Sequence, residues 1–251
     1  DPTTQLHVWN RSTHKSNHLK NQHAQGKVVV CDSPKEVMDK CDLVYAMLST
    51  PDVCKAVYEM DGGVLSGVRH STKLVDCATL AEEDMERLAS QVAQRGGRFL
   101  AAPVSGSKGP AAAGQLIFLA GGDEALFKEI EPTHLSAMGK SSFYFGSSPG
   151  AAAKMKLVVN MIMGTMMASL GEGIALCVAA DLDAAKLLEV LDLGVCASTL
   201  FKIKGPKVLV DDHEPNFPLM HAQKDMRLAV ELGQSVGLEL PVAAATDGAM
   251  V

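Results

Sequence analysis

The chain has 251 residues, which allows one large domain or two modest ones, each able to bury a core. Hydrophobic residues make up 47% and charged residues 21%, as in an ordinary globular protein. The net charge of −6 and the lack of any basic run longer than a pair argue against a nucleic-acid-binding face. The six cysteines show no C-x-x-C spacing, so we expect reduced core thiols and no metal site.

Short apolar runs alternate with amphipathic helical stretches through the first half of the chain. The runs lie at residues 6–9, 28–31, 43–48, 74–77, 99–104, 116–120 and 142–145, and helical patterns occupy residues 33–40 and 80–95. Strands that alternate with helices predict an α/β fold, a doubly wound parallel sheet of the Rossmann type. We assign this dinucleotide-binding domain to residues 1–148.

The composition changes after Gly150, where residues 151–180 form one long apolar helical pattern without proline. Further helical patterns at residues 184–191 and 219–236 predict an all-α second domain over residues 149–251. The Ser147–Gly150 segment, which contains a Pro-Gly pair, marks the boundary. The long helix carries more small and apolar positions than a small helical domain can cover, so we expect a homodimer or homotetramer. We expect no membrane partner.

The residues that follow the first strand suggest a cofactor site. Asn10, Arg11 and Ser12 come directly after the apolar run that ends at Trp9. In dinucleotide folds, an arginine near the end of the second strand accommodates the 2′-phosphate of NADP. An exposed loop arginine is the alternative. The cofactor interpretation also requires a glycine-rich turn upstream, and since none precedes residue 6, we expect about 25 further residues there.

A Ser-Gly-Ser turn forms the second candidate site. Ser105, Gly106 and Ser107 follow the apolar run that ends at Val104. Such a turn can leave backbone N–H groups free to hold a carboxylate. An ordinary strand-to-loop turn would have the same sequence.

Two lysines in helical segments form the remaining candidates. Lys156 lies four residues before Asn160, so both occupy one helix face, and the next charged residue is Glu172. Such a lysine either reaches for solvent at the helix end or serves as a general acid, with Asn160 orienting a substrate oxygen. Lys224, beside Asp225, is either a cofactor contact or half of a surface ion pair.

Taken in order, these segments resemble the β-hydroxyacid dehydrogenase family over essentially the whole chain. The resemblance rests on VWNRS (8–12), AMLS (46–49), VDCATL (75–80), APVSGSKGPAAAGQL (102–116), AKMKLVVNMIMG (153–164), FKIKGP (201–206) and FPLMHAQKDMRLA (217–229). The branch it most resembles is that of the glyoxylate/succinic semialdehyde reductases. In this family the C-terminal helices extend further, so we also expect residues beyond Val251.

The resemblance implies a role for each matched position. Lys156 corresponds to the catalytic lysine, Asn160 to its substrate-orienting partner, and Ser105, Gly106 and Ser107 to the substrate-carboxylate loop. The implied cofactor contacts are Asn10, Arg11, Ser12, Met47, Leu48, Thr79 and Lys224. The implied substrate contacts also include Phe201 and Asp225.

The implied activity is the NADPH-dependent reduction of small aldehydes to hydroxyacids. One alternative is an NAD-dependent dehydrogenase of the 3-hydroxyisobutyrate type, and a second is a non-catalytic oligomeric scaffold with the same fold. We expect a small-molecule aldehyde or hydroxyacid as partner, no nucleic acid, and a cytoplasmic location, or an organellar one if a transit segment precedes residue 1.

Overall fold

A computed structural model describes residues 5–251 of the chain. The chain divides into two compact units, Asp1–Ala153 and Lys154–Val251. Helix α8 (Pro149–Ala179) passes from the first unit into the second. The domain boundary that the sequence suggests, between residues 148 and 149, coincides with the start of this helix and stays a prediction.

The first unit contains eight strands in two sheets, among the residues that the structure describes. Strands β1 (Leu6–Val8) and β2 (Val28–Val30) form a separate parallel pair. The larger sheet has the order β3-β4-β5-β7-β6, with β8 also paired to β7. Its strands are β3 (Leu43–Ala46), β4 (Lys73–Asp76), β5 (Arg98–Ala101), β6 (Val104–Ser105), β7 (Leu116–Gly122) and β8 (Gly139–Tyr144).

The predicted doubly wound sheet is confirmed, with one difference in strand direction. Strands β3, β4 and β5 are parallel, as expected, but β7 runs antiparallel to both β5 and β6. The pairing of β7 with β8 is parallel again. The short segment between β5 and β6 turns the chain at the edge where the parallel strands end, and that edge also carries the predicted cofactor contacts Met47, Leu48 and Thr79.

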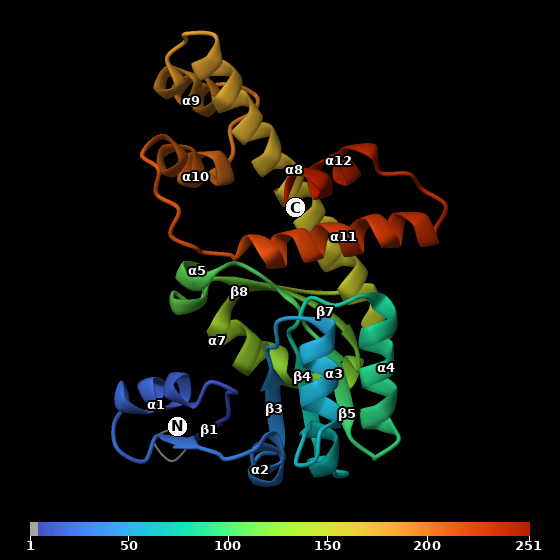
Figure 1. Ribbon diagram of the computed structural model, residues 1–251. Coiled ribbons are helices and arrows are strands. Elements are labelled where there is room, and N and C mark those ends of the chain that lie inside the picture. The colour runs from blue at the N-terminus through green and yellow to red at the C-terminus, as the bar shows by residue number, and fades with distance from the viewer. Residues whose placement is uncertain (1–4) are drawn as a thin grey trace. The chain divides into compact units, whose positions relative to one another are not determined.

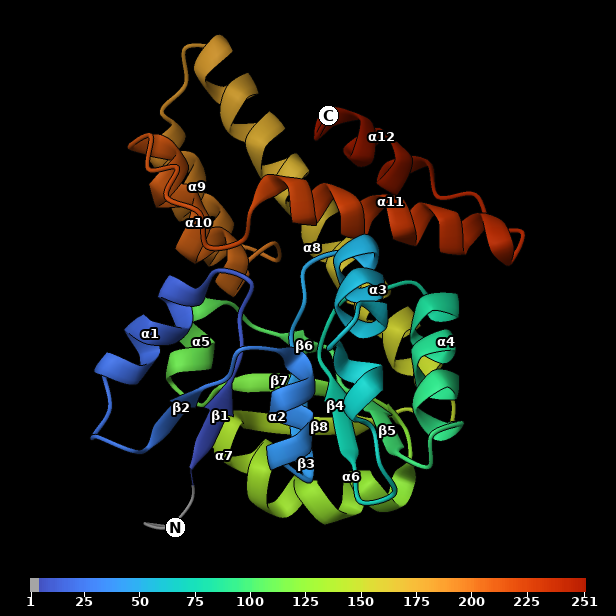
Figure 2. The same cartoon turned by 60° about the horizontal axis from the view of Figure 1, so that its bottom comes forward.

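Helices cover both faces of the larger sheet (Figures 1 and 2). The helices of the first unit are α1 (Thr13–Asn21), α2 (Pro34–Lys40), α3 (Pro51–Glu59), α4 (Glu82–Ala93), α5 (Lys108–Ala112), α6 (Glu124–Ile130) and α7 (Ser136–Met138), with a 3₁₀ turn at Val64–Gly67 and a π-helical turn at Glu131–Leu135. Of these, α1 lies beside the separate β1–β2 pair. Several start at a capping side chain before a proline: Ser33 caps α2 and Thr50 caps α3. Such caps satisfy helix N–H groups that otherwise lack partners.

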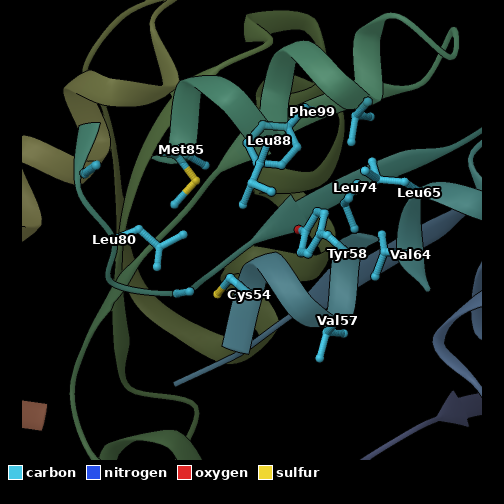
Figure 3. Close-up of a cluster of buried hydrophobic side chains, with 14 of the residues drawn as sticks. Cys54, Val57, Tyr58, Val64, Leu65, Leu74, Leu80, Met85, Leu88 and Phe99 are labelled. Carbon is cyan, nitrogen blue, oxygen red and sulfur yellow. The ribbon is translucent and has the colours of Figure 1, made fainter. Parts of the chain in front are cut away.

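Alternation along the strands divides the core of the first unit into two layers. Leu74 and Phe99 point to the face covered by α3 and α4, where they pack with Tyr58, Met85 and Leu88 (Figure 3). Their neighbours on the same strands, including Val75 and Leu100, join the opposite cluster with residues of α6 and the π-helical turn. Because successive strand residues point to opposite faces, continuous apolar runs are what a sheet covered on both sides requires.

The second unit is entirely helical. After α8 it contains α9 (Ala184–Leu193), α10 (Thr199–Leu209), α11 (Leu219–Ser235) and α12 (Pro241–Ala249). The end of the Met226 side chain, on α11, lies against Gly164 of α8, where a Cβ would be 2.4 Å from the Met226 Cε atom. Helix α8 is long and apolar enough to cross a membrane by length and composition alone, a test that core helices of globular proteins also pass.

A buried tyrosine–aspartate pair ties α3 to the end of β4. The Tyr58 hydroxyl donates to Oδ2 of Asp76 at 2.5 Å, and the Ala78 N–H donates to Oδ1 at 2.8 Å. Neither Tyr58 nor Asp76 is exposed. Burial raises the pKa of Asp76 to about 6, and the Tyr58 hydrogen bond opposes that rise. The pair thereby fixes the segment that begins at Cys77.

We expect Tyr58→Phe to lower the free energy of unfolding in a pH-dependent way. The loss of its hydroxyl raises the Asp76 pKa further, so the ionised carboxylate loses a partner while the protonated acid loses little. The destabilisation is about 1–3 kcal/mol at pH 8 and smaller at pH 5, measured by urea denaturation. Tyr144→Phe is the control, because its hydroxyl donates to the neutral carbonyl of Gly122. Equal losses at both pH values for Tyr58→Phe would contradict the assignment.

Candidate active site

Helix α8 places Lys156 and Asn160 one turn apart in a buried position. Nζ of Lys156 donates to Oδ1 of Asn160 at 2.7 Å, and each residue is only 6% exposed. The apolar residues around them on α8 provide no competing charge until Glu172. Lys156 therefore does not reach out to solvent from the helix end, which was one of the two interpretations that the sequence left open.

Helix α11 completes the cluster with Asp225 and Lys224. The amide Nδ2 of Asn160 donates to Oδ2 of Asp225 at 2.6 Å, and Nζ of Lys224 lies 2.9 Å from the other oxygen, Oδ1. Asp225 is 2% exposed and Lys224 is 7% exposed. The surface ion pair that the sequence allowed is therefore a buried pair. Asn160 connects Lys156 to Asp225, with its amide orientation set by a donor on one side and an acceptor on the other.

The electrostatics of this cluster bring the pKa of Lys156 close to neutral pH. Burial lowers the pKa of Lys156 from 10.5 to about 8; the Asp225 carboxylate opposes this shift, and the Lys224 ammonium adds to it. A lysine with such a pKa exists in both protonation states near pH 8, so it can give a proton to a developing alkoxide and regain it from water. These four residues are thus able to serve as a general-acid site.

Most of the predicted contacts in the first unit lie at one edge of its sheet. Met47 and Leu48 follow β3 and Thr79 follows β4, and the Cys77 N–H bonds to the Ala46 carbonyl oxygen across the two strand ends. The segment that leads to Ser105 leaves β5 from this same edge, since β5 is parallel to β4. Open α/β sheets bind their ligands in the crevice outside the carboxyl ends of the strands.

The Ser-Gly-Ser turn has a backbone that requires glycine at its centre. Gly106 has φ of +127°, and a Cβ there would lie 2.9 Å from Leu116 Cδ2. Ser105 ends β6 and Ser107 precedes the short helix α5. The turn is thus fixed in a conformation that other residues rarely adopt. Its contact with a substrate carboxylate stays a prediction.

The segment after β1 forms a tight turn into α1. Oδ1 of Asn10 accepts from the Ser12 N–H at 2.8 Å, and the intervening Arg11 is exposed. An asparagine that bonds the backbone two residues ahead is typical of turns. The turn leaves the Arg11 side chain available to a ligand phosphate.

Phe201 is not brought into the Lys156 cluster. It lines a hollow between α9 and α10 with residues such as Leu188, Leu191 and Pro206, and none of Lys156, Asn160, Lys224 and Asp225 belongs to that lining. Its role in substrate binding stays a prediction. Within residues 5–251, no group of three histidine, cysteine or acidic side chains is placed to hold a metal ion.

His221 precedes Asp225 by one turn of α11 and was not predicted from the sequence as a site residue. Its Nδ1 atom is buried and has no hydrogen-bond partner. The available signal was its spacing of four residues from Asp225, which puts both side chains on one helix face.

Comparison with known proteins agrees with this fold. Residues 2–146 match the sequence profile of the NAD-binding domain of 6-phosphogluconate dehydrogenase, and residues 150–251 match the NAD-binding profile of NADP-dependent 3-hydroxyisobutyrate dehydrogenase. The chain is thus an NAD(P)-dependent oxidoreductase.

Two curated relatives and one solved structure define the family further. The chain is 45% identical to glyoxylate/succinic semialdehyde reductase 1 of Arabidopsis thaliana over 96% of its own length and 82% of that protein. It is 43% identical to the chloroplastic reductase 2, covering 96% of this chain and 65% of that protein. Mycobacterium tuberculosis 3-hydroxyisobutyrate dehydrogenase superimposes with a TM-score of 0.84 at 23% identity, covering 99% of this chain and 85% of that one. The chain belongs to the β-hydroxyacid dehydrogenase family.

We expect Asp225→Asn to shift the pH dependence of turnover. A proton donor must be protonated, so kcat for aldehyde reduction falls as the pH rises through the Lys156 pKa. Because the Asp225 carboxylate holds that pKa up, its neutral replacement moves the falling limb to lower pH, by roughly one unit or more. The measurement is kcat against pH at saturating substrates.

The matched control is Glu231→Gln, which removes an exposed carboxylate from the same helix. We expect its falling limb to coincide with that of the wild type. A limb that stays in place or moves to higher pH in Asp225→Asn would refute the electrostatic role of Asp225.

Proposed function

We propose that this protein reduces small aldehydes that carry a carboxylate, glyoxylate and succinic semialdehyde, to hydroxyacids with NADPH. The observation that carries the proposal is the buried Lys156, held by Asn160 and brought to a pKa of about 8. The substrate class comes from the two Arabidopsis relatives, whose names state this activity.

The chain has groups that suit a nicotinamide cofactor. Two buried side-chain atoms of α11 near Lys224 lack a hydrogen-bond partner: His221 Nδ1 and Asp225 Oδ1. A bound ligand can supply the missing partners of such atoms. Arg11, exposed after β1, would contact the 2′-phosphate, with Asn10 and Ser12 shaping the turn. Met47, Leu48 and Thr79 would line the cofactor at the strand ends, and Lys224 would lie near the nicotinamide. When bound, NADPH supplies the hydride.

The residues of the chain then control the substrate and the proton. The Ser105–Ser107 turn would hold the carboxylate, which fixes the position of the aldehyde carbon. The positive charge of Lys156 stabilises the carbonyl oxygen as negative charge develops there, and Nζ then gives it a proton. Asn160 keeps the ammonium in place, because its own orientation is fixed by Asp225.

Arg11 favours NADPH over NAD, and therefore favours the reductase over the 3-hydroxyisobutyrate-type dehydrogenase. An arginine at this position suits the 2′-phosphate that NAD lacks. Lys156 itself argues against the non-catalytic scaffold, because a buried ammonium with a pKa of about 8 suits a proton donor.

A second copy of the chain is the proposed cover for α8. The most apolar stretch of this helix is only 17% buried, and Val158, Ile162 and Leu176 are among its exposed residues. A homodimer or homotetramer would remove this surface from water. The cytoplasm is the proposed compartment and an organelle the alternative, since the second Arabidopsis relative is named as chloroplastic.

Steady-state kinetics of the full-length protein test the function. We expect NADPH with glyoxylate or succinic semialdehyde to give a higher kcat/KM than NADH with the same aldehydes or NAD with 3-hydroxyisobutyrate. Lys156→Met should lower kcat by about 10²–10⁴-fold, because the proton donor is gone. The protein should still fold, because methionine has a side-chain volume close to that of lysine. Lys154→Met, two residues earlier on α8, is the control and should retain turnover.

Two outcomes would refute the proposal. Near-normal turnover of Lys156→Met would remove Lys156 from the chemistry. A wild-type protein that binds NADPH and reduces neither aldehyde would support one of the alternatives, the dehydrogenase if 3-hydroxyisobutyrate is oxidised and the scaffold if it is not.

A further inference from the structure

Two buried polar atoms without hydrogen-bond partners lie on one turn of α11. Among residues 5–251, three buried side-chain atoms lack such a partner: Tyr45 Oη in the first unit, and His221 Nδ1 and Asp225 Oδ1 in the second. His221 and Asp225 are four residues apart, so their side chains are neighbours on the helix surface. A buried group without a partner costs free energy, and two such groups side by side indicate a ligand that satisfies both.

Asp225 offers an acceptor at this position. Its Oδ2 atom is occupied by the Asn160 amide at 2.6 Å. Its Oδ1 atom lies 2.9 Å from Lys224 Nζ, a contact that balances charge but lacks the alignment of a hydrogen bond, so the oxygen can still accept from a ligand. An ionised carboxylate has no proton to donate, and the ligand must therefore supply a donor here.

His221 offers a nitrogen beside that acceptor. The Phe217 ring lies against the imidazole, with 6.4 Å between ring centroids and 37° between ring planes. A neutral imidazole can carry its proton on Nδ1 and donate it. The turn therefore presents an acceptor and a possible donor next to each other.

The donor and acceptor properties of His221 Nδ1 and Asp225 Oδ1 decide which group of the substrate or cofactor can bind to both. A substrate carboxylate has no donor for Asp225 Oδ1 and would be repelled by it. A hydroxyl can donate one proton and also accept one, but it does both at a single oxygen atom, so it meets both atoms only where they converge on one point. A primary carboxamide has an NH₂ donor and a carbonyl acceptor in one plane, which complements both atoms.

We infer that His221 and Asp225 bind the carboxamide of the nicotinamide ring, with its NH₂ donating to Asp225 Oδ1 and its carbonyl accepting from His221 Nδ1. The inference rests on the proposed function for the choice of cofactor. It gives His221 a role in positioning the ring. It also makes Asp225 a shared anchor, because the same carboxylate orients Asn160 and, through it, Lys156.

A cofactor analogue tests the donor to Asp225 without reference to turnover. The 3-acetylpyridine analogue of NADP⁺ keeps the carbonyl and replaces NH₂ by a methyl group. Isothermal titration calorimetry of the full-length protein, without substrate, gives the Kd of each cofactor. We expect the analogue to bind at least about tenfold more weakly than NADP⁺, the loss of one hydrogen bond to a charged group.

Variants of His221 test the contact with the carbonyl. His221→Leu should weaken NADP⁺ and the analogue by the same factor, about three- to tenfold, because both carry the carbonyl. His221→Asn can return a polar atom to the place of Nδ1 and should bind like the wild type, whereas His221→Gln, which reaches the place of Nε2, should bind like the leucine variant. His213→Leu, an exposed histidine of the same unit, is the control.

Three results would overturn the inference. Equal affinity of the wild type for NADP⁺ and the analogue would remove the NH₂ contact. An unchanged Kd in His221→Leu and His221→Gln would remove the histidine contact, and weakening of NADP⁺ alone would show that His221 does not bind the carbonyl. These results are separable from failure of the proposed function, in which NADP⁺ binds as expected but neither aldehyde is reduced.

Discussion

The burial of one ammonium group, that of Lys156, is the constraint on which the second unit depends. An isolated buried charge is strongly unfavourable, and it is tolerated only when hydrogen bonds and an opposite charge compensate it. Here Asn160 supplies the hydrogen bond and Asp225 the opposite charge. That compensation requires Asn160 on α8 and Asp225 on α11 to stay within hydrogen-bond distance of each other. The incomplete compensation leaves the lysine able to release its proton near pH 8.

The first unit depends on a related arrangement, in which the buried group is a carboxyl group and not an ammonium group. Asp76 is a buried carboxyl group at the end of β4, and it is held by the Tyr58 hydroxyl and the Ala78 N–H. In both units a polar group inside the core fixes the position of a segment with predicted ligand contacts. Such buried hydrogen-bonded groups favour one arrangement, since a shift of either element would break the bonds that hold a charge inside the core.

The sequence was sufficient to predict the parts of the molecule that depend on local pattern. The apolar runs predicted the strands, and the spacing of Lys156 and Asn160 predicted their shared helix face. The direction of β7 was not predictable, because pairing with β5 depends on contacts between distant segments. Asp225 was predicted as a site residue, but its bond to Asn160 was not, because that bond joins residues 65 positions apart. His221 was overlooked because an isolated histidine carries no pattern until the burial of its nitrogen is known.

The pKa of Lys156 is measured most directly by titration of its own ammonium group. NMR of the full-length protein with labelled lysine side chains would follow each ammonium group from pH 6 to 11. We expect one lysine signal with a midpoint near 8, the value that burial gives to Lys156, and the absence of that signal from Lys156→Met. Ordinary lysines titrate at about 10.4. If every lysine signal titrated there or higher, Lys156 would not be the buried proton donor on which this account depends.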